Sequence, residues 1–251
     1  MSPSDDAVID ILSNLPVFNP RKWVECKIKE PIKKQIASEA VETAYRLQAT
    51  DSIQAEDFEP ILRAVQHSSR VVRDVGAELL KALAKKHSIV LEIIKGLLNS
   101  KDSKIRFTAI AYLSSSYPRD FLIEIVGRGL NDKSSSVRMI AADACAGIGL
   151  KELLPLLENL LLTEKDPNLE DVKRHIGILK DGYHLNYSSG GRPWLTFKNS
   201  KGEIIGIMLK KEQLDNEDLL TIVAKEMQRF EFRDAQPAPG PEAINPPRSG
   251  L

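Results

Sequence analysis

Apolar residues in the middle of the chain recur in pairs of helical stripes. Residues 58–65 carry apolar side chains at positions i, i+3, i+4 and i+7, which is the spacing of one face of an α-helix. Residues 72–83 repeat this spacing over one further turn. The polar residues 67–69 lie between the two stripes and can cap the second helix. The pattern predicts a helical hairpin.

The hairpin occurs four times with a period close to 32 residues. Three columns of positions recur at this spacing and align equivalent points of successive copies. The columns are Ile61, Ile93, Ile125 and Leu157; Phe58, Val90, Leu122 and Leu154; and Val65, Leu97 and Leu161, with Gly129 at the remaining place. Agreement of three columns over four copies identifies a tandem repeat.

Each second helix opens with an aliphatic residue followed by a basic one. The pairs are Val72-Arg73, Ile105-Arg106, Val137-Arg138 and Val172-Lys173. We expect the three arginines to form a structural ladder, in which each side chain reaches the polar turn or the adjacent copy. The expected partner of Arg138 is an aspartate such as Asp132 or Asp102.

The third copy favours small residues in its second helix. Its expected buried face consists of Val137, Ile140, Ala141, Ala144, Cys145 and Ile148. Small side chains at Ala141 and Ala144 would let neighbouring helices approach closely. Gly147 and Gly149 fit the helix end, where glycine carries least strain in a left-handed conformation. Cys145 is interpreted as a small buried hydrophobe.

The order of apolar helix, Asp-containing turn, Val-Arg pair and Ala-rich helix resembles the HEAT-like repeats of α-solenoids, including their short bacterial forms. The resemblance covers residues 58–180 and extends more weakly back to residues 32–37. It implies a mainly α fold, a HEAT-like solenoid of stacked hairpins. The fourth copy departs from the pattern with Lys173 and His175, as a capping repeat with a more polar outer face would.

After residue 181 the apolar period changes from 3.6 to 2. Residues 182–187, 192–199 and 203–210 have the pattern of short strands, with a hairpin connection at 199–202. Residues 215–230 return to helical spacing, and Asn216 is the expected cap. The solenoid is therefore followed by a small C-terminal β-hairpin and α module.

These changes predict four segments. They are an N-terminal helical cap over residues 1–50, HEAT-like repeats over 51–181, the small β and α module over 182–233, and a Pro-rich tail without regular structure over 234–251. The N-terminus has no basic leader and no apolar run reaches membrane-spanning length, so we expect a cytoplasmic protein without membrane contact.

Charge and candidate chemistry narrow the function. Lys and Arg together number 35, and so do Asp and Glu. This balance disfavours non-specific binding to nucleic acid. The histidines form no His-x-x-x-His or His-Glu pair, phosphate loops are absent, and two distant cysteines build no metal site. We expect no catalytic residue, no metal and no cofactor, and therefore a non-enzymatic protein.

The remaining candidate is a surface that binds another protein. Off-stripe positions of the second helices would lie on the concave solenoid face, and several are apolar. The expected partner-binding residues are Asp74, Glu78, Lys81, Phe107, Ile110, Met139 and Asp143. The alternative is that packing between successive copies hides them. An adaptor or an immunity-type inhibitor is one concrete form of such a scaffold.

Two other functions stay open at this point. HEAT-like DNA glycosylases resemble the chain only in the repeat, because Trp23 and Trp194 lie outside the best copies. A nucleic-acid-binding or DNA-repair protein is therefore the alternative function. A lyase-like or chaperone role toward a cofactor-bearing protein is a third, which no residue singles out.

Overall fold

The computed structural model describes residues 19–164, 168–188, 190–199 and 203–235. The chain divides into two compact units, residues 1–172 and 173–251. The first eighteen residues, the hairpin connection at 200–202 and the Pro-rich tail from 236 onward lie outside the described residues.

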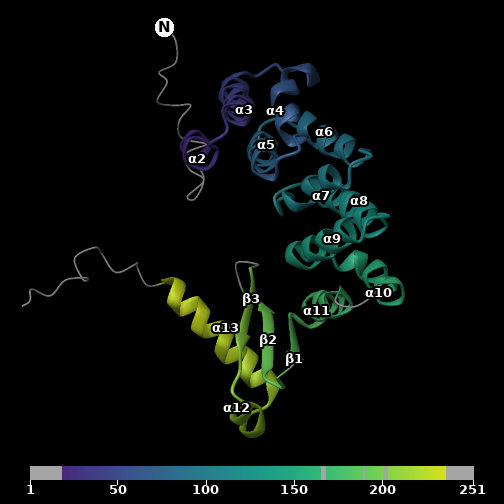
Figure 1. Ribbon diagram of the computed structural model, residues 1–251. Helices are drawn as coiled ribbons and strands as arrows, with labels where there is room; N and C mark the ends of the chain where they lie inside the picture. Colours follow the sequence, from purple (N-terminus) through teal and green to yellow (C-terminus); the bar gives the residue numbers. More distant parts are fainter. Residues whose placement is uncertain (1–18, 165–167, 189, 200–202, 236–251) are drawn as a thin grey trace, which may run out of the picture. The chain divides into compact units, whose positions relative to one another are not determined.

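The first unit is a stack of helices (Figure 1). From α5 onward, α5, α7 and α9 form one row and α6, α8 and α10 another (Figure 1). In chain order the elements are α2 (Pro20–Lys27), α3 (Pro31–Ala49), the 3-10 turn η1 (Ala55–Phe58), α4 (Glu59–Val65), α5 (Arg70–Leu83), α6 (Ile89–Leu97), α7 (Ser103–Ala111), α8 (Arg119–Leu130), α9 (Ser135–Ile148), the 3-10 turn η2 (Lys151–Leu153), α10 (Leu154–Thr163) and α11 (Asn168–Asp181), which continues into the second unit. This architecture confirms the mainly α solenoid.

Most positions of the three columns lie in the core, but Ile93, Leu154 and Leu161 do not. Ile61, Ile125 and Leu157 are each 0% exposed. Ile93 is only half-buried, so its expected place in the core is wrong. The reason is the rotation of α6, which turns Val90, Ile94 and Leu97 to the core and leaves Ile93 at its edge. These three positions still follow helical spacing.

Two glycines allow helices to come closer than any other residue would permit. A Cβ atom on Gly76 would lie 2.7 Å from the backbone nitrogen of Val65. A Cβ atom on Gly129 would lie 2.4 Å from Ile110 Cδ1 and 2.8 Å from Ala141 Cβ. Gly129, at the third place of the third column, therefore allows close contact between α7, α8 and α9.

Helix α9 is buried on a face that differs in part from the expected one. Ile140, Ala144 and Ile148 are only half-buried, whereas Ala142 is 0% exposed. The difference arises because α9 packs against both α7 and α8, so its buried surface is wider than one stripe and rotated toward Ala142. Gly149 ends α9 in the expected left-handed conformation, with φ of 85°. Burial raises the pKa of the Cys145 thiol to about 12, as suits a small core residue.

The second unit contains an antiparallel sheet in the order β1-β2-β3. Its strands are β1 (Tyr183–Tyr187), β2 (Pro193–Lys198) and β3 (Ile204–Met208), followed by α12 (Lys211–Asn216) and α13 (Leu219–Ala235). Leu195 and Phe197 point from the central strand into a core shared with Ile222 and Val223 of α13.

The C-terminal helix begins later than the expected residue 215. Asn216 ends the separate helix α12, so its expected capping role is wrong. Asp218 caps α13 instead, because its carboxylate accepts hydrogen bonds from the backbone nitrogen of Thr221 at 3.0 Å and from the Thr221 hydroxyl. These bonds lower the pKa of Asp218.

Candidate protein-binding surface

A groove of about 660 Å³ crosses the row formed by α5, α7 and α9. We call this surface the α5–α7–α9 face. Each of the three helices contributes side chains, so the groove spans consecutive repeats. Its principal lining residues are Arg70, Arg73 and Asp74 of α5, Phe107 of α7, Tyr112 directly after α7, and Ile140 of α9.

The structure brings only some of the expected binding residues to this groove. Asp74 and Phe107 line it and are half-buried. Glu78 and Lys81 lie further along α5 and form an ion pair of 3.8 Å with each other. On α9, Met139 is half-buried and Asp143 is exposed, and neither lines the groove.

Ile110 does not belong to a binding surface, and its place in the expected set is corrected. Its side chain is only 1% exposed and lies against Gly129 of α8. Packing between successive helices therefore hides this residue, as the alternative interpretation of these positions required. Ile110 fits into the core because Gly129 has no side chain at this point.

Tyr112 and Ile140 line the groove but were not expected there. Tyr112 follows Thr108 by one helical turn, and this spacing is the sequence signal that could have placed it on the same face as Thr108. No such signal existed for Ile140, because the helical spacing of the apolar residues around it predicted a buried side chain. The packing of α9 on two neighbours turns it outward.

Charges at the groove are paired on one side. The carboxylate of Asp74 lies 3.6 Å from Arg70 Nε. Burial, with the nearby carboxylates of Asp74 and Glu78, raises the pKa of Tyr112, so the phenol keeps its proton and can donate a hydrogen bond. An apolar floor with ionic and hydroxyl groups at its rim is typical of protein-binding sites.

The ladder arginines lie at the starts of the same helices. Arg106 Nη1 donates to the carbonyl oxygens of Ser100 and Lys101, at 2.8 and 3.1 Å. Its Nε and Nη2 each donate to the Asp132 carboxylate at 2.7 Å. Arg138 repeats this arrangement with the carbonyl oxygen of Asp132 and the carboxylate of Glu164. Arg106 and Arg138 thus each join their own turn to the following one.

Comparison with known protein families identifies the type of repeat in this stack of helices. Residues 90–172, from α6 to the first turns of α11, match the family model of HEAT repeats. The protein is a HEAT-like repeat protein. No curated protein and no solved structure matches the chain. HEAT repeats commonly act as protein-interaction scaffolds, because stacked hairpins present long continuous surfaces.

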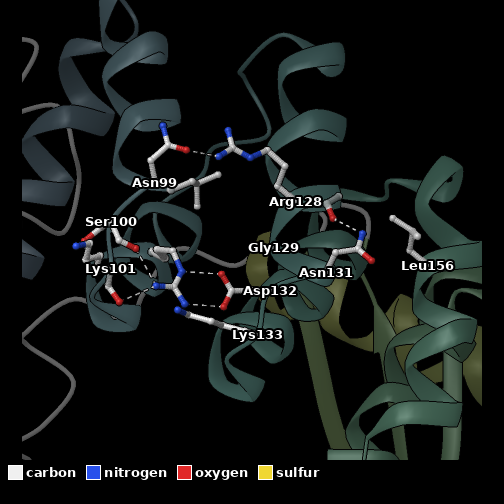
Figure 2. A pocket seen from close by; sticks show the side chains of 12 residues that line it. Asn99, Ser100, Lys101, Arg128, Gly129, Asn131, Asp132, Lys133 and Leu156 are labelled. Atoms are coloured by element: carbon white, nitrogen blue, oxygen red, sulfur yellow. Dashed lines mark hydrogen bonds and ion pairs between the residues drawn. The ribbon is translucent and has the colours of Figure 1, made fainter.

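A second groove, of about 670 Å³, lies at the turns of the HEAT-like stack (Figure 2). The Asn99 side-chain oxygen accepts a hydrogen bond of 2.7 Å from Arg128 Nη2 across it (Figure 2). Lys101 and Lys133 line the same groove, in which Asp132 is held by the ladder arginine. These pairs join neighbouring repeats.

The residues that the structure describes contain neither a candidate metal site nor a membrane-spanning helix. No set of three or more His, Cys, Asp and Glu side chains in this part of the chain could hold a metal ion. None of the helices found there has the length and apolar character needed to span a membrane.

Proposed function

We propose that this HEAT-like repeat protein is a non-enzymatic scaffold that binds another protein on its α5–α7–α9 face. An adaptor, or an inhibitor that covers the active surface of its partner, is the form we favour, acting in the cytoplasm. Both cysteines are free thiols, as is usual in a reducing compartment.

The groove across three successive repeats is the observation that carries this proposal. Phe107, Tyr112 and Ile140 are half-buried there, so each offers apolar surface that a partner could cover. The polar and ionic groups at the rim can set the orientation of the partner. Stacked repeats hold these side chains on rigid helices, which lowers the entropic cost of binding.

The charge of the face supports a protein ligand over a nucleic acid. Binding to phosphate backbones needs a run of cations that no nearby acid neutralises. On this face Arg70 and Lys81 stand beside the carboxylates of Asp74 and Glu78. We therefore expect no salt-sensitive binding of labelled DNA or RNA in fluorescence anisotropy, and such binding would favour the alternative function.

The proposal is tested by affinity capture from native extract with paired variants. Wild type and the double variant Phe107→Asp, Ile140→Asp are compared by quantitative mass spectrometry. Charges placed on the apolar floor would have to be desolvated by a bound protein, so the partner should be lost from the double variant. Circular dichroism establishes that the variant remains folded.

Leu162→Asp is the matched control. Leu162 lies on α10, outside the α5–α7–α9 row, and is 83% exposed, so this change alters an apolar surface residue elsewhere. The control should capture the same proteins as wild type. Equal capture by wild type and the double variant would contradict the proposed face, and absence of any captured partner would contradict the scaffold function.

A further inference from the structure

The first arginine of the ladder lacks the carboxylate that the other two possess. Arg106 and Arg138 each bind a carboxylate 26 residues downstream, from Asp132 and Glu164 respectively. The same step from Arg73 leads to Asn99. The Asn99 side-chain oxygen is already bound by Arg128 Nη2 (Figure 2).

Arg73 is held on one side only. Its Nη1 donates to the carbonyl oxygens of His67 and Ser68 at 2.8 and 2.7 Å, as the other ladder arginines do in their own turns. Its Nε has no hydrogen-bond partner within the described part of the chain, although the residue is only 8% exposed. A buried guanidinium N–H without an acceptor is unfavourable, and an incoming acceptor would remove that penalty.

Arg73 also lines the groove of the α5–α7–α9 face. The charged side chains that line this groove are three cations, from Arg70, Arg73 and Lys104, and one carboxylate, from Asp74. Because Asp74 is within 3.6 Å of Arg70, the positive charge of Arg73 is not balanced from within the groove. The groove is thus complementary to an added negative charge.

We propose that an aspartate or glutamate side chain of the protein partner occupies this groove and binds Arg73. It takes the place that Asp132 and Glu164 fill beside Arg106 and Arg138, so the partner completes the ladder. A neighbouring apolar residue of the partner packs on Phe107 and Ile140. This inference rests on the proposed function, for which it specifies the partner chemistry.

A carboxylate fits the site better than the phosphates of a nucleic acid. Both completed positions of the ladder hold carboxylates, and the guanidinium fork matches their planar geometry. A nucleic acid would continue along the face past Arg70 and Lys81, whose charges Asp74 and Glu78 already neutralise, so these cations offer little to its successive phosphates. One isolated acidic side chain needs only Arg73.

The test selects random peptides displayed on phage against the full-length protein. We expect enriched peptides to share one acidic residue beside an apolar one. Replacement of that acid by its amide, or Arg73→Gln in the protein, should each weaken binding roughly tenfold. Combining the two changes should add little, because both remove the same interaction.

Arg119→Gln is the control, since it removes the same charge from an exposed ion pair with Glu152, outside the groove, and should leave peptide affinity unchanged. A direct measurement needs no variant of the protein. The NMR signal of the Arg73 Nε–H group should shift on addition of the acidic peptide and stay in place with its amide form. This readout also applies if Arg73→Gln does not fold.

Three results would overturn the inference, and they separate it from the proposed function. Peptides that depend on Phe107 but on no acidic residue would contradict the carboxylate and leave the protein-binding face intact. Peptides that bind without dependence on Phe107 would contradict both. Binding of a double-stranded DNA oligonucleotide that is lost in Arg73→Gln would assign the site to phosphate instead.

Discussion

The ladder arginine Arg106 is held from two directions by groups of different repeats. Its side chain is 5% exposed and that of Asp132 is 12% exposed, so water screens their interaction weakly. Backbone carbonyl oxygens of its own turn occupy the remaining donor. Such a pair contributes more through the cost of breaking it than through its net energy of formation.

Replacement of Asp132 by alanine should therefore destabilise the protein strongly. The change leaves a buried guanidinium charge without its carboxylate and removes the acceptor for the backbone nitrogen of Ser134. We expect a loss of about 3 kcal/mol in the free energy of unfolding, measured by urea denaturation. Glu152→Ala is the control, because Arg119 and Glu152 form the same two-pronged pair with both side chains about half exposed. Its effect should be much smaller, and equal effects would contradict the role of burial.

The two ladder carboxylates should also make the stability depend on pH. The hydrogen bond from Arg106 holds the pKa of Asp132 below its ordinary 3.8. Burial raises the pKa of Glu164, but hydrogen bonds from Arg138, Asn168 and Ser135 outweigh it and hold the value below 4.5. A lowered folded-state pKa stabilises the fold above the ordinary value, and this contribution is lost as pH falls through the lowered one.

We therefore expect the urea midpoint to fall as the solution is acidified from about pH 5 to about pH 2. The double variant Asp132→Asn, Glu164→Gln should show a shallower decline, since two of the titrating groups are removed. Parallel curves for the variant and wild type would contradict this assignment.

Single residues show how far sequence reasoning reaches. The period and the Val-Arg pairs located the arginines, but not their partners. Arg138 was expected to pair with an aspartate side chain and instead binds Glu164 and a backbone carbonyl of Asp132. The partner lies 26 residues away in the chain, and only the stacking of one repeat on the next decides which turn residue comes within reach.

At the scale of the elements, the smallest residues set how closely neighbouring helices pack. Gly76 of α5 faces the backbone of α4, where a Cβ atom would lie 2.7 Å from Val65 nitrogen and 3.0 Å from the carbonyl oxygen of Ile61. Backbone atoms cannot turn away as side-chain ends can. The close approach of α4 and α5 therefore depends on Gly76.

Alanine at position 76 should push α5 away from α4 and destabilise the protein by about 1–3 kcal/mol. Gly96→Ala on α6 is the matched control, because nothing lies within 4 Å of the position of its added Cβ atom. There the better helix propensity of alanine should stabilise the protein by up to about 1 kcal/mol. Thermal denaturation measures both changes, and the same sign for the two would contradict the packing argument.

On the scale of the whole molecule, each unit has a core of its own. Phe197 of β2 is 0% exposed and meets Phe230 of α13 edge to face, with ring centroids 5.8 Å apart. Phe58, at the end of η1, is also 0% exposed within the first unit. The stability of a solenoid is a sum over neighbouring repeats, so damage to one core should have local effects.

Phe197→Ala should cost the second unit about 3–5 kcal/mol and lower hydrogen-exchange protection in the strands and α13. Protection of α4 to α9 should stay as in wild type. Phe58→Ala should produce the converse pattern, with loss in the first repeats and none in the sheet. Loss of protection throughout the chain in either variant would contradict separate cores.

The sequence by itself determined the repeat, the class of fold, most of the buried column positions and the strands of the second unit. Those features follow from local spacing, since 3.6-residue and 2-residue periods decide which side chains share a face. Tertiary structure decided which faces are covered. Packing of α9 on two neighbours rotated it, which buried Ala142 and turned Ile140 to the groove, whereas Ile110 of α7 is buried against Gly129. The tertiary structure also directs the Asn99 side chain to Arg128, and Arg73 Nε is left without a partner among the described residues.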